Sequence, residues 1–165
     1  MMGDVRRVVT GHAVDGRSIV STDGAVPVVQ RDYSGVPDLD FFEVWRTHGA
    51  LPNVGNIADP TVGGEMRLAS ADAGTTFRVV DFPAGGFVSP MHRTETVDYG
   101  IVLSGRMHLV LTDSDIALEP GDVVIQRGTD HAWANRSDAP ARMAFVLIAG
   151  RFDDEIRPFV SSVTP

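Results

Sequence analysis

Residues 89–105, SPMHRTETVDYGIVLSG, combine groups that could do chemistry with an apolar strand. Alternate positions hold a histidine, two threonines and an aspartate: His92, Thr94, Thr96 and Asp98. On an unbroken β-strand, alternate side chains point to the same face. Burying imidazole and carboxylate groups is costly unless they bind a ligand or one another. The pattern therefore predicts that this face lines a site as well as a core.

A second block, RGTDHAWAN, repeats the alternation with His131, Trp133 and Asn135. Two imidazoles and one carboxylate from two strands are the ingredients of a 2-His-1-carboxylate site. Such sites take Fe(II), Mn, Ni or Zn and leave coordination positions open. We therefore expect His92, Asp98 and His131 to hold one divalent metal ion and to carry the catalysis.

Four further residues are candidates for substrate binding. Trp133 could stack on a planar substrate or fill the core. Arg127, in the turn before the second histidine, could bind a substrate carboxylate with two hydrogen bonds, or simply hold the turn. Thr94 and Asn135 lie on the proposed inner face. Without a metal, Asp98 would serve as a general acid or base with a shifted pKa, and the histidines would be polar groups of a binding pocket.

Short strand-like runs separated by turns position these residues. RRVVTGHAVDGRSIVST predicts a hairpin turning at Asp15-Gly16. Further strands are expected in FFEVWRT, in TTFRVVDF, in a hairpin around Asp113–Asp115 and in ARMAFVLIAG. Residues 49–74 are rich in Gly, Pro, Asn and Asp, which is typical of a lid or binding loop. Many short strands with frequent turns predict an all-β sandwich or barrel.

Composition excludes several classes of function. The 165 residues suit one domain, and a net charge of −8 leaves no basic stripe for nucleic acid. The chain has no cysteine, so disulfides and thiolate metal ligands are impossible. Its longest apolar run, residues 144–149, is too short to cross a bilayer, and its start lacks a secretory signal. We expect a cytoplasmic protein that does not bind membranes.

The first block resembles motif 1 of the cupin superfamily. Residues 86–105 match every spacing of that motif, from Gly86 to Gly105. Two identities differ, because Thr94 stands at the usual second histidine and Asp98 at the usual glutamate. The resemblance implies that Asp98 is the carboxylate ligand, while the hydroxyl of Thr94 could support a neighbouring ligand.

Motif 2 of the same superfamily is similar to residues 121–135. Gly121, His131 and Asn135 match it, while QRG replaces the usual Pro-x-Gly. Together the motifs imply a double-stranded β-helix, the jelly-roll barrel of cupins, as a single domain over residues 1–165. In that barrel the histidine of each motif is a metal ligand.

Within the superfamily, MHRTETVDYGIVLSG and DVVIQRGTDHAWANRS are similar to small cupins of bacteria and of fungal aromatic-polyketide pathways. Some of these are decarboxylases of anthraquinone-type acids. The resemblance implies a metal-dependent lyase that decarboxylates a small aromatic or keto acid. Dioxygenase or cyclase chemistry on a similar substrate is the near alternative, and a non-catalytic, metal-free metabolite-binding cupin is the second. The cupin resemblance also implies a homodimer formed through the N-terminal strands within residues 1–48.

Overall fold

The computed structural model describes residues 2–63, 66 and 73–160. The strands, in chain order, are β1 Arg6–His12, β2 Ser18–Ala25, β3 Val29–Gln30, β4 Asp40–Arg46, β5 Thr75–Phe82, β6 Phe87–Val88, β7 Thr96–Ser104, β8 Met107–Val110, β9 Asp115–Leu118, β10 Val123–Arg127, β11 Ala132–Asn135 and β12 Ala141–Ala149. Two single 3₁₀ turns, η1 Tyr33–Gly35 and η2 Arg157–Phe159, complete the described elements. Within those ranges, no helix has the length and hydropathy of a membrane span.

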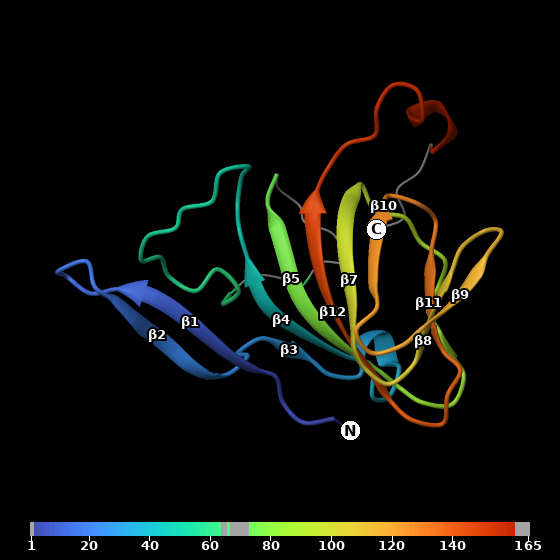
Figure 1. The fold of residues 1–165 in the computed structure, drawn as a ribbon, viewed down its shortest axis with the longest axis horizontal. Helices are drawn as coiled ribbons and strands as arrows, with labels where there is room; N and C mark the ends of the chain where they lie inside the picture. Colours follow the sequence, from blue (N-terminus) through green and yellow to red (C-terminus); the bar gives the residue numbers. More distant parts are fainter. Residues whose placement is uncertain (1, 64–65, 67–72, 161–165) are drawn as a thin grey trace.

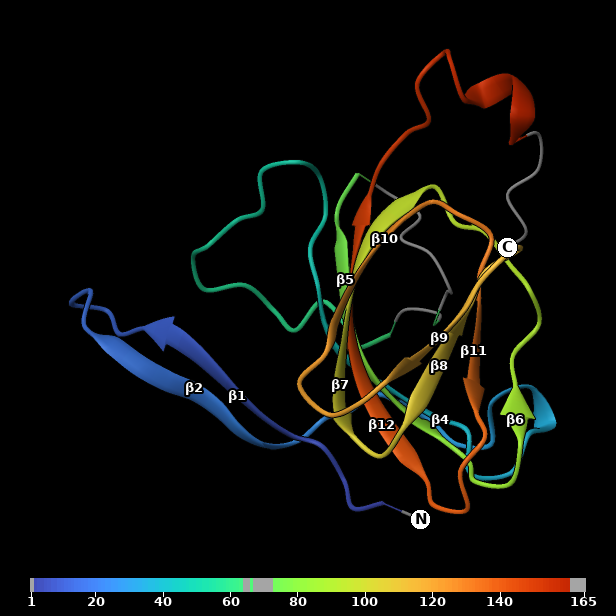
Figure 2. The ribbon, with the colours of Figure 1, turned by 45° about the vertical axis from the view of Figure 1, so that its right-hand side comes forward.

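Two antiparallel sheets form the body of the molecule (Figures 1 and 2). The larger sheet has the strand order β10-β7-β12-β5-β4-β3, and the smaller has the order β6-β11-β8-β9. The pairs β3–β4, β4–β5 and β8–β9 are consecutive in the chain, whereas β10–β7, β7–β12, β12–β5, β6–β11 and β11–β8 join strands that are not. This is an all-β jelly roll, as the turn-rich sequence and the cupin resemblance predicted.

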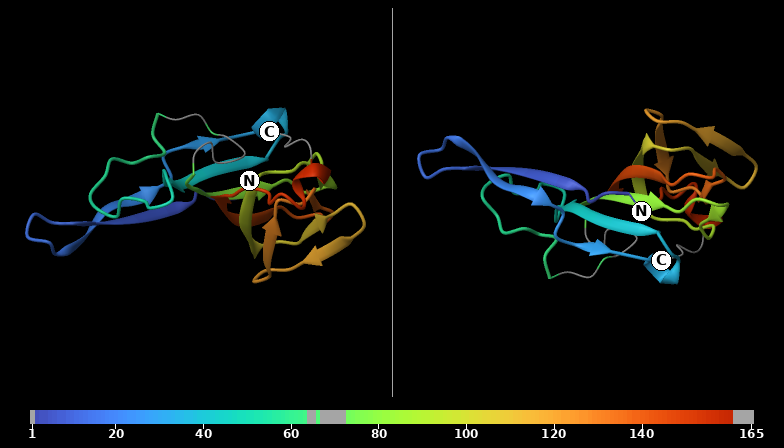
Figure 3. Two further views of the ribbon diagram at one scale, coloured as in Figure 1. Left: turned by 90° about the horizontal axis from the view of Figure 1, so that it is seen from above. Right: turned by 90° about the horizontal axis from the view of Figure 1, so that it is seen from below.

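The N-terminal strands stand apart from the two main sheets. β1 and β2 pair only with each other and turn through Gly16, whose φ of 82° is readily adopted by glycine. Seen from above and from below, this hairpin extends to one side of the barrel (Figure 3). The predicted hairpin at Asp15-Gly16 is confirmed, as are the later predicted strands. In the predicted loop, residues 49–63, 66, 73 and 74 contain no strand or helix, and the rest lies outside the described residues.

Alternate residues of the central strands build the core between the sheets. Val80 on β5 and Met143 on β12 are at most 2% exposed, and both belong to one large apolar cluster. Their neighbours on the inward face, Phe82 and Phe145, contact each other edge-on with ring centroids 6.5 Å apart. Burial of such side chains stabilises the fold by about 1.5–3 kcal/mol each. The same inward face continues toward the predicted site.

The strand that was expected to run through residues 89–98 is interrupted. β6 ends at Val88 and pairs in the smaller sheet, whereas β7 begins at Thr96 and pairs in the larger one. The intervening residues therefore cross between sheets, and Pro90 cannot donate a ladder hydrogen bond. His92 lies within this crossing, where it forms an isolated antiparallel bridge with His131. The single alternating face is thus assembled from a crossing segment followed by a strand.

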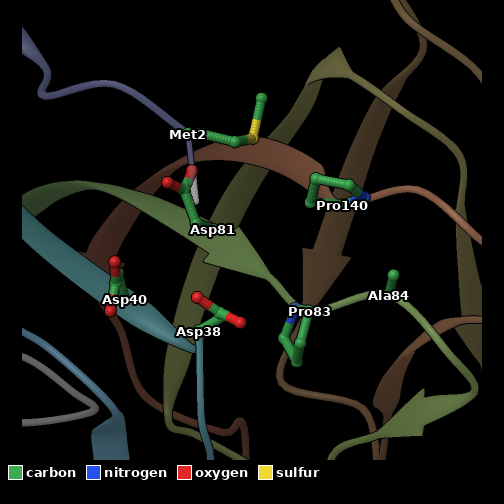
Figure 4. Close-up of a pocket in the computed structure, with 7 residues that line it drawn as sticks. All are labelled: Met2, Asp38, Asp40, Asp81, Pro83, Ala84 and Pro140. Atoms are coloured by element: carbon green, nitrogen blue, oxygen red, sulfur yellow. The ribbon is translucent and has the colours of Figure 1, made fainter.

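Ion pairs hold the start of β4 against the end of β5. The guanidinium of Arg142 donates to both oxygens of Asp81 at 2.5 and 2.7 Å, and Arg31 donates to Asp40 at 2.5 Å. Both guanidiniums lie over the ring of Phe42, at 5.4 and 5.0 Å from its centroid. Asp40 and Asp81 border a small hollow near the N-terminus (Figure 4). Because each carboxylate has an arginine partner, we assign these residues a structural role at this end of the barrel.

Candidate active site

A cavity of about 690 Å³ opens into the barrel between the two sheets. That volume is typical of small-molecule sites. Most of its wall is aromatic or aliphatic, with contributions from Phe82, Trp133 and Phe145. The polar residues on the wall are Ser34, Arg78, Ser89, His92, Thr94, Asp98 and His131. A few polar groups in a largely apolar cavity suit an organic ligand with a polar end.

The two motif histidines meet on this wall. The ring centroids of His92 and His131 are 4.2 Å apart, and their backbones exchange two hydrogen bonds of 2.9 Å. Nδ1 of His92 lies 3.0 Å from the carbonyl oxygen of Pro90, and Nδ1 of His131 lies 2.9 Å from that of Thr129. A carbonyl oxygen only accepts, so we assign the proton of each ring to Nδ1. Each Nε2 is left with a lone pair, the arrangement that metal-ligating histidines use.

His131 is held neutral by its surroundings. It is 2% exposed, and burial lowers its pKa from 6.5 to about 4. The amide of Gln126 lies behind the ring, and its nitrogen donates at 2.7 Å to the Thr129 carbonyl, the oxygen that also accepts from Nδ1 of His131. The groups at Nδ1 therefore fix the orientation of the ring, and its Nε2 carries a free lone pair at neutral pH.

Asp98 lies on the same wall and retains its proton to a higher pH than an ordinary aspartate. Burial raises its pKa, and the hydroxyl of Thr96 is the largest of the opposing influences. Arg78, His92 and Thr94 oppose the rise more weakly. The carboxyl is 7% exposed, and its Oδ1 has no hydrogen-bond partner in the described structure. Asp98 lines the cavity, so a carboxyl that retains its proton there is suited to proton exchange with a ligand.

The predicted metal ligands are only partly assembled. The structure brings His92 and His131 together, and both present the Nε2 lone pair that a divalent ion needs. Asp98 shares the cavity, yet the described residues include no group of three His, Asp or Glu side chains spaced to hold one ion. The two histidines fit a metal ion by their chemistry, and the three-ligand set stays a prediction.

The four predicted substrate-binding residues divide into two pairs. Trp133 and Thr94 line the cavity. Arg127 and Asn135 are not part of its described lining. Arg127 ends β10 in an exposed position, because its neighbour Gln126 takes the inward one. The amide of Asn135 is fully buried and donates to two backbone carbonyls at 3.0 and 2.8 Å, so it holds a turn.

Residues from outside the two motifs complete the cavity. Arg78 on β5 and Phe41 on β4 line it from the larger sheet, and Tyr33 lines it from η1. The rings of Tyr33 and Phe41 lie 4.5 Å apart. One signal in the sequence could have identified Arg78, because it is the charged residue at an inward position of the apolar run TTFRVVDF. The other two offer no such signal.

The buried neutral ring of His131 makes stability depend on pH. Between about 4 and 6.5 the unfolded chain binds more protons at this residue than the folded chain. Its stabilising contribution is therefore fully present above pH 6.5 and is lost as the pH falls toward 4. The decrease from 6.5 to about 4 corresponds to at most about 3 kcal/mol. Urea unfolding of metal-free protein between pH 4.5 and 7.5 measures it.

The matched variant is His131→Gln, which keeps a polar side chain without a titrating group. We expect its free energy of unfolding to rise less steeply with pH than that of the wild type. Asp98 is present in both proteins and acts in the opposite sense, since its raised pKa favours the folded state most at low pH. Parallel pH profiles for the two proteins would contradict the assignment of His131 as buried and neutral.

A jelly roll whose cavity carries one histidine from each of these two motifs defines the cupin class of proteins. The chain belongs to this family: the family model described as Cupin domain matches residues 78–148. The "Oryzines biosynthesis cluster protein J" of Aspergillus oryzae is 34% identical over 155 residues, which are 87% of this chain and 82% of that protein.

Two other relatives match a shorter region. The "Phomopsin biosynthesis cluster protein C'" of Diaporthe leptostromiformis is 48% identical over 84 residues, 50% of this chain and 44% of that protein. The "Cupin-domain-containing oxidoreductase fogC" of Aspergillus ruber is 40% identical over 79 residues, 46% of this chain and 38% of that protein. The similarity to these two proteins thus spans less than half of their length.

Proposed function

We propose that the protein is a cupin enzyme that binds a small aromatic or keto carboxylic acid in this cavity and releases its carboxylate as CO2. The observation that carries the proposal is Asp98, a buried carboxyl with an oxygen that lacks a partner, on a cavity wall shared with His92 and with the buried, neutral imidazole of His131. Decarboxylation needs a proton at the carbon that loses CO2. A carboxyl that retains its proton inside an aromatic cavity can supply it.

His92 and His131 would hold a divalent ion, one of Fe, Mn, Zn or Ni, through their Nε2 atoms. Such an ion supplies Lewis-acid polarisation of a keto or ortho-hydroxyl oxygen. The protein's own residues orient the substrate. Trp133 and Phe145, whose rings meet nearly edge-on with centroids 5.2 Å apart, provide a wall for a planar ring. Apolar surroundings also exclude water from the carbon that is to be protonated.

Asp98 acts as the general acid in this account. From a β-keto acid, the carbon–carboxylate bond breaks, CO2 leaves, the electron pair of that bond is delocalised onto the keto oxygen, and the proton of Asp98 then passes to the carbon. From an ortho-hydroxyaryl acid, the proton of Asp98 passes first to the carbon that carries the carboxylate; the hydroxyl becomes a keto group, and loss of CO2 with return of that oxygen's electrons and proton restores the aromatic ring. Solvent restores the proton to Asp98. The net reaction consumes one proton for each CO2 released, and it needs no oxidant.

The names of two relatives, from Aspergillus oryzae and Diaporthe leptostromiformis, support a role in a biosynthesis cluster, and the name of a third relative favours a second candidate function. The Aspergillus ruber relative is named an oxidoreductase. Oxidation of a similar acid by O2 would use the same cavity, with iron at the two histidines. Cyclisation of such a substrate and simple metabolite binding are the remaining alternatives.

A panel of ortho-hydroxyaryl and β-keto acids distinguishes these functions. Each acid is incubated with the enzyme in air and under argon, and CO2 release, O2 uptake and product mass are followed. We expect a product lighter by CO2 at equal rates in both atmospheres. Product that forms only in air with O2 consumption would establish the oxidative alternative instead. Binding of acids without any product would indicate a metabolite-binding protein.

The metal content of the purified protein tests the role of the histidines. Protein prepared without chelator or a nickel column should contain about one equivalent of Fe, Mn, Zn or Ni, and His92→Ala should lose most of it. His108→Ala is the control, because His108 pairs with Asp115 through Nδ1 and is not part of the described cavity lining. Elemental analysis gives the answer. No metal in the wild type, or equal metal in wild type and His92→Ala, would exclude this role.

We also propose that two copies associate through the N-terminal hairpin. β1 and β2 form a sheet of their own that projects from the barrel. Their side chains Val8, Ile19 and Val20 are 49%, 45% and 59% exposed. A projecting hairpin with exposed apolar side chains and open edges is stabilised when another chain covers it.

A further inference from the structure

Arg78 is a buried cation on the wall of the cavity. It lies on β5, is 3% exposed, and points inward between the buried residues Thr76 and Val80 of the same strand face. Its guanidinium carbon is 5.8 Å from the centre of the Phe41 ring, which also lines the cavity. Of the described residues on the wall, Arg78 is the one with a permanent positive charge. Neither sequence motif contains it.

A carboxylate behind Arg78 fixes its position. Glu43 of β4 stands opposite Arg78 in the sheet, and its Oε2 is 3.6 Å from Nη2 of Arg78. Glu43 is fully buried, and its Oε1 accepts a hydrogen bond of 2.8 Å from Nε of Arg46. Arg78 also has electrostatic interactions with Asp98 and Tyr33. A guanidinium has five N–H donors in a rigid plane, so one held by Glu43 can also bind a ligand oxyanion.

We propose that Arg78 binds the carboxylate of the ligand, so that the cavity selects organic anions over neutral molecules of the same shape. The guanidinium would meet the carboxylate through paired N–H donors. Phe145 lies beside Arg78 on β12 and faces Trp133, so the ring of the ligand would extend along this aromatic wall. The inference names the ligand class for the cavity of the proposed function, and it requires only binding.

The position of Arg78 relative to Asp98 fits such a ligand. β12 lies between β5 and β7, and Leu147 of β12 pairs with both Thr76 and Asp98. Asp98 is therefore two strands and one inward-facing residue away from Arg78. The two side chains interact electrostatically across this distance. A carboxylate held by Arg78 would therefore lie in the same cavity as Asp98.

Two probes of equal shape test the inference. Calorimetry measures the dissociation constants of 2-naphthoate and 2-naphthamide for the metal-free wild type and for variants. We expect the wild type to prefer the anion by about 10- to 100-fold, the effect of a charged hydrogen-bonded pair. Arg78→Met should abolish the preference while keeping the affinity for the amide within about threefold. Arg127→Met removes an equal charge from an exposed position and should leave the preference unchanged.

Arg78→Met leaves Glu43 buried without this partner and could unfold the chain. The double variant Arg78→Met/Glu43→Gln removes both charges and should also lose the preference, with amide binding as its evidence of folding. The inference is overturned if the wild type binds naphthoate no better than naphthamide, or if either Met variant of Arg78 keeps the preference. It is also overturned if Arg127→Met loses the preference.

The proposed function can fail separately. Preference for the anion without CO2 release from any acid would leave the inference standing and remove the decarboxylase. CO2 release by a wild-type protein that does not prefer the anion would support the decarboxylase and overturn the role of Arg78.

Discussion

Asp98→Asn should slow CO2 release by about 10²- to 10⁴-fold while ligand affinity changes only a few-fold. The amide has nearly the shape of the carboxyl but cannot donate an acidic proton. Because burial raises the pKa of Asp98, the wild-type rate should fall as the pH rises through that pKa, when the acid is lost. The variant should lack this decline. Initial rates and dissociation constants over a range of pH measure both effects.

Asp115→Asn is the matched control for this substitution. Asp115 is a carboxylate in a partly exposed pair with His108 and Arg136, and it is not part of the described cavity lining. Its variant should release CO2 at the wild-type rate. If Asp98→Asn retained the wild-type rate and pH profile, Asp98 would not be the general acid. The proton would then have to come from another group or from water.

Glu43→Gln should lower the free energy of unfolding by about 3–5 kcal/mol, the cost of leaving a buried charge without its partner. Glu43 accepts from Arg46 at 2.8 Å and lies 3.6 Å from Arg78, and its carboxylate is fully buried. For a chain of this length, such a loss lowers the melting temperature by about 10 °C. Thermal and urea unfolding monitored by circular dichroism measure it.

The control is an ion pair on the surface. Arg6 and Asp23 share two hydrogen bonds of 2.7 Å, but their side chains are 71% and 44% exposed. Asp23→Asn should therefore cost about 1 kcal/mol or less. If Glu43→Gln cost no more than Asp23→Asn, the buried carboxylate of Glu43 would not stabilise the fold through Arg78 and Arg46.

Local patterns in the sequence were sufficient to predict an all-β fold, and the resemblance to the two cupin motifs added the jelly roll and the histidine pair. The turn at Asp15-Gly16 and the alternating apolar residues of β5 and β12 depend on nearby residues, so each could be interpreted without the rest of the chain. His92 and His131 were recognised because each lies in a motif bounded by glycines at fixed spacings. The structure places the two rings together on the cavity wall.

Pairings between strands that are distant in sequence could not be predicted in this way. Arg78 joins the site because β5 lies beside β12, and no spacing within TTFRVVDF expresses that pairing. Arg127 was predicted to bind a substrate carboxylate. On β10, however, its neighbour Gln126 faces inward, and Arg127 is exposed. Asn135 does face inward, but two backbone carbonyls already occupy its amide. The change of sheet between Val88 and Thr96 was likewise invisible to an alternation rule.

The most direct test of the central claim is turnover of carboxyl-¹³C acids in D2O. The enzyme is given the panel of ortho-hydroxyaryl and β-keto acids, and gas and product are analysed by mass spectrometry. The account predicts that ¹³CO2 is released and that the product gains one deuterium at the carbon that carried the carboxylate. Products that retain the ¹³C label or that contain oxygen from O2 would contradict decarboxylation in this cavity.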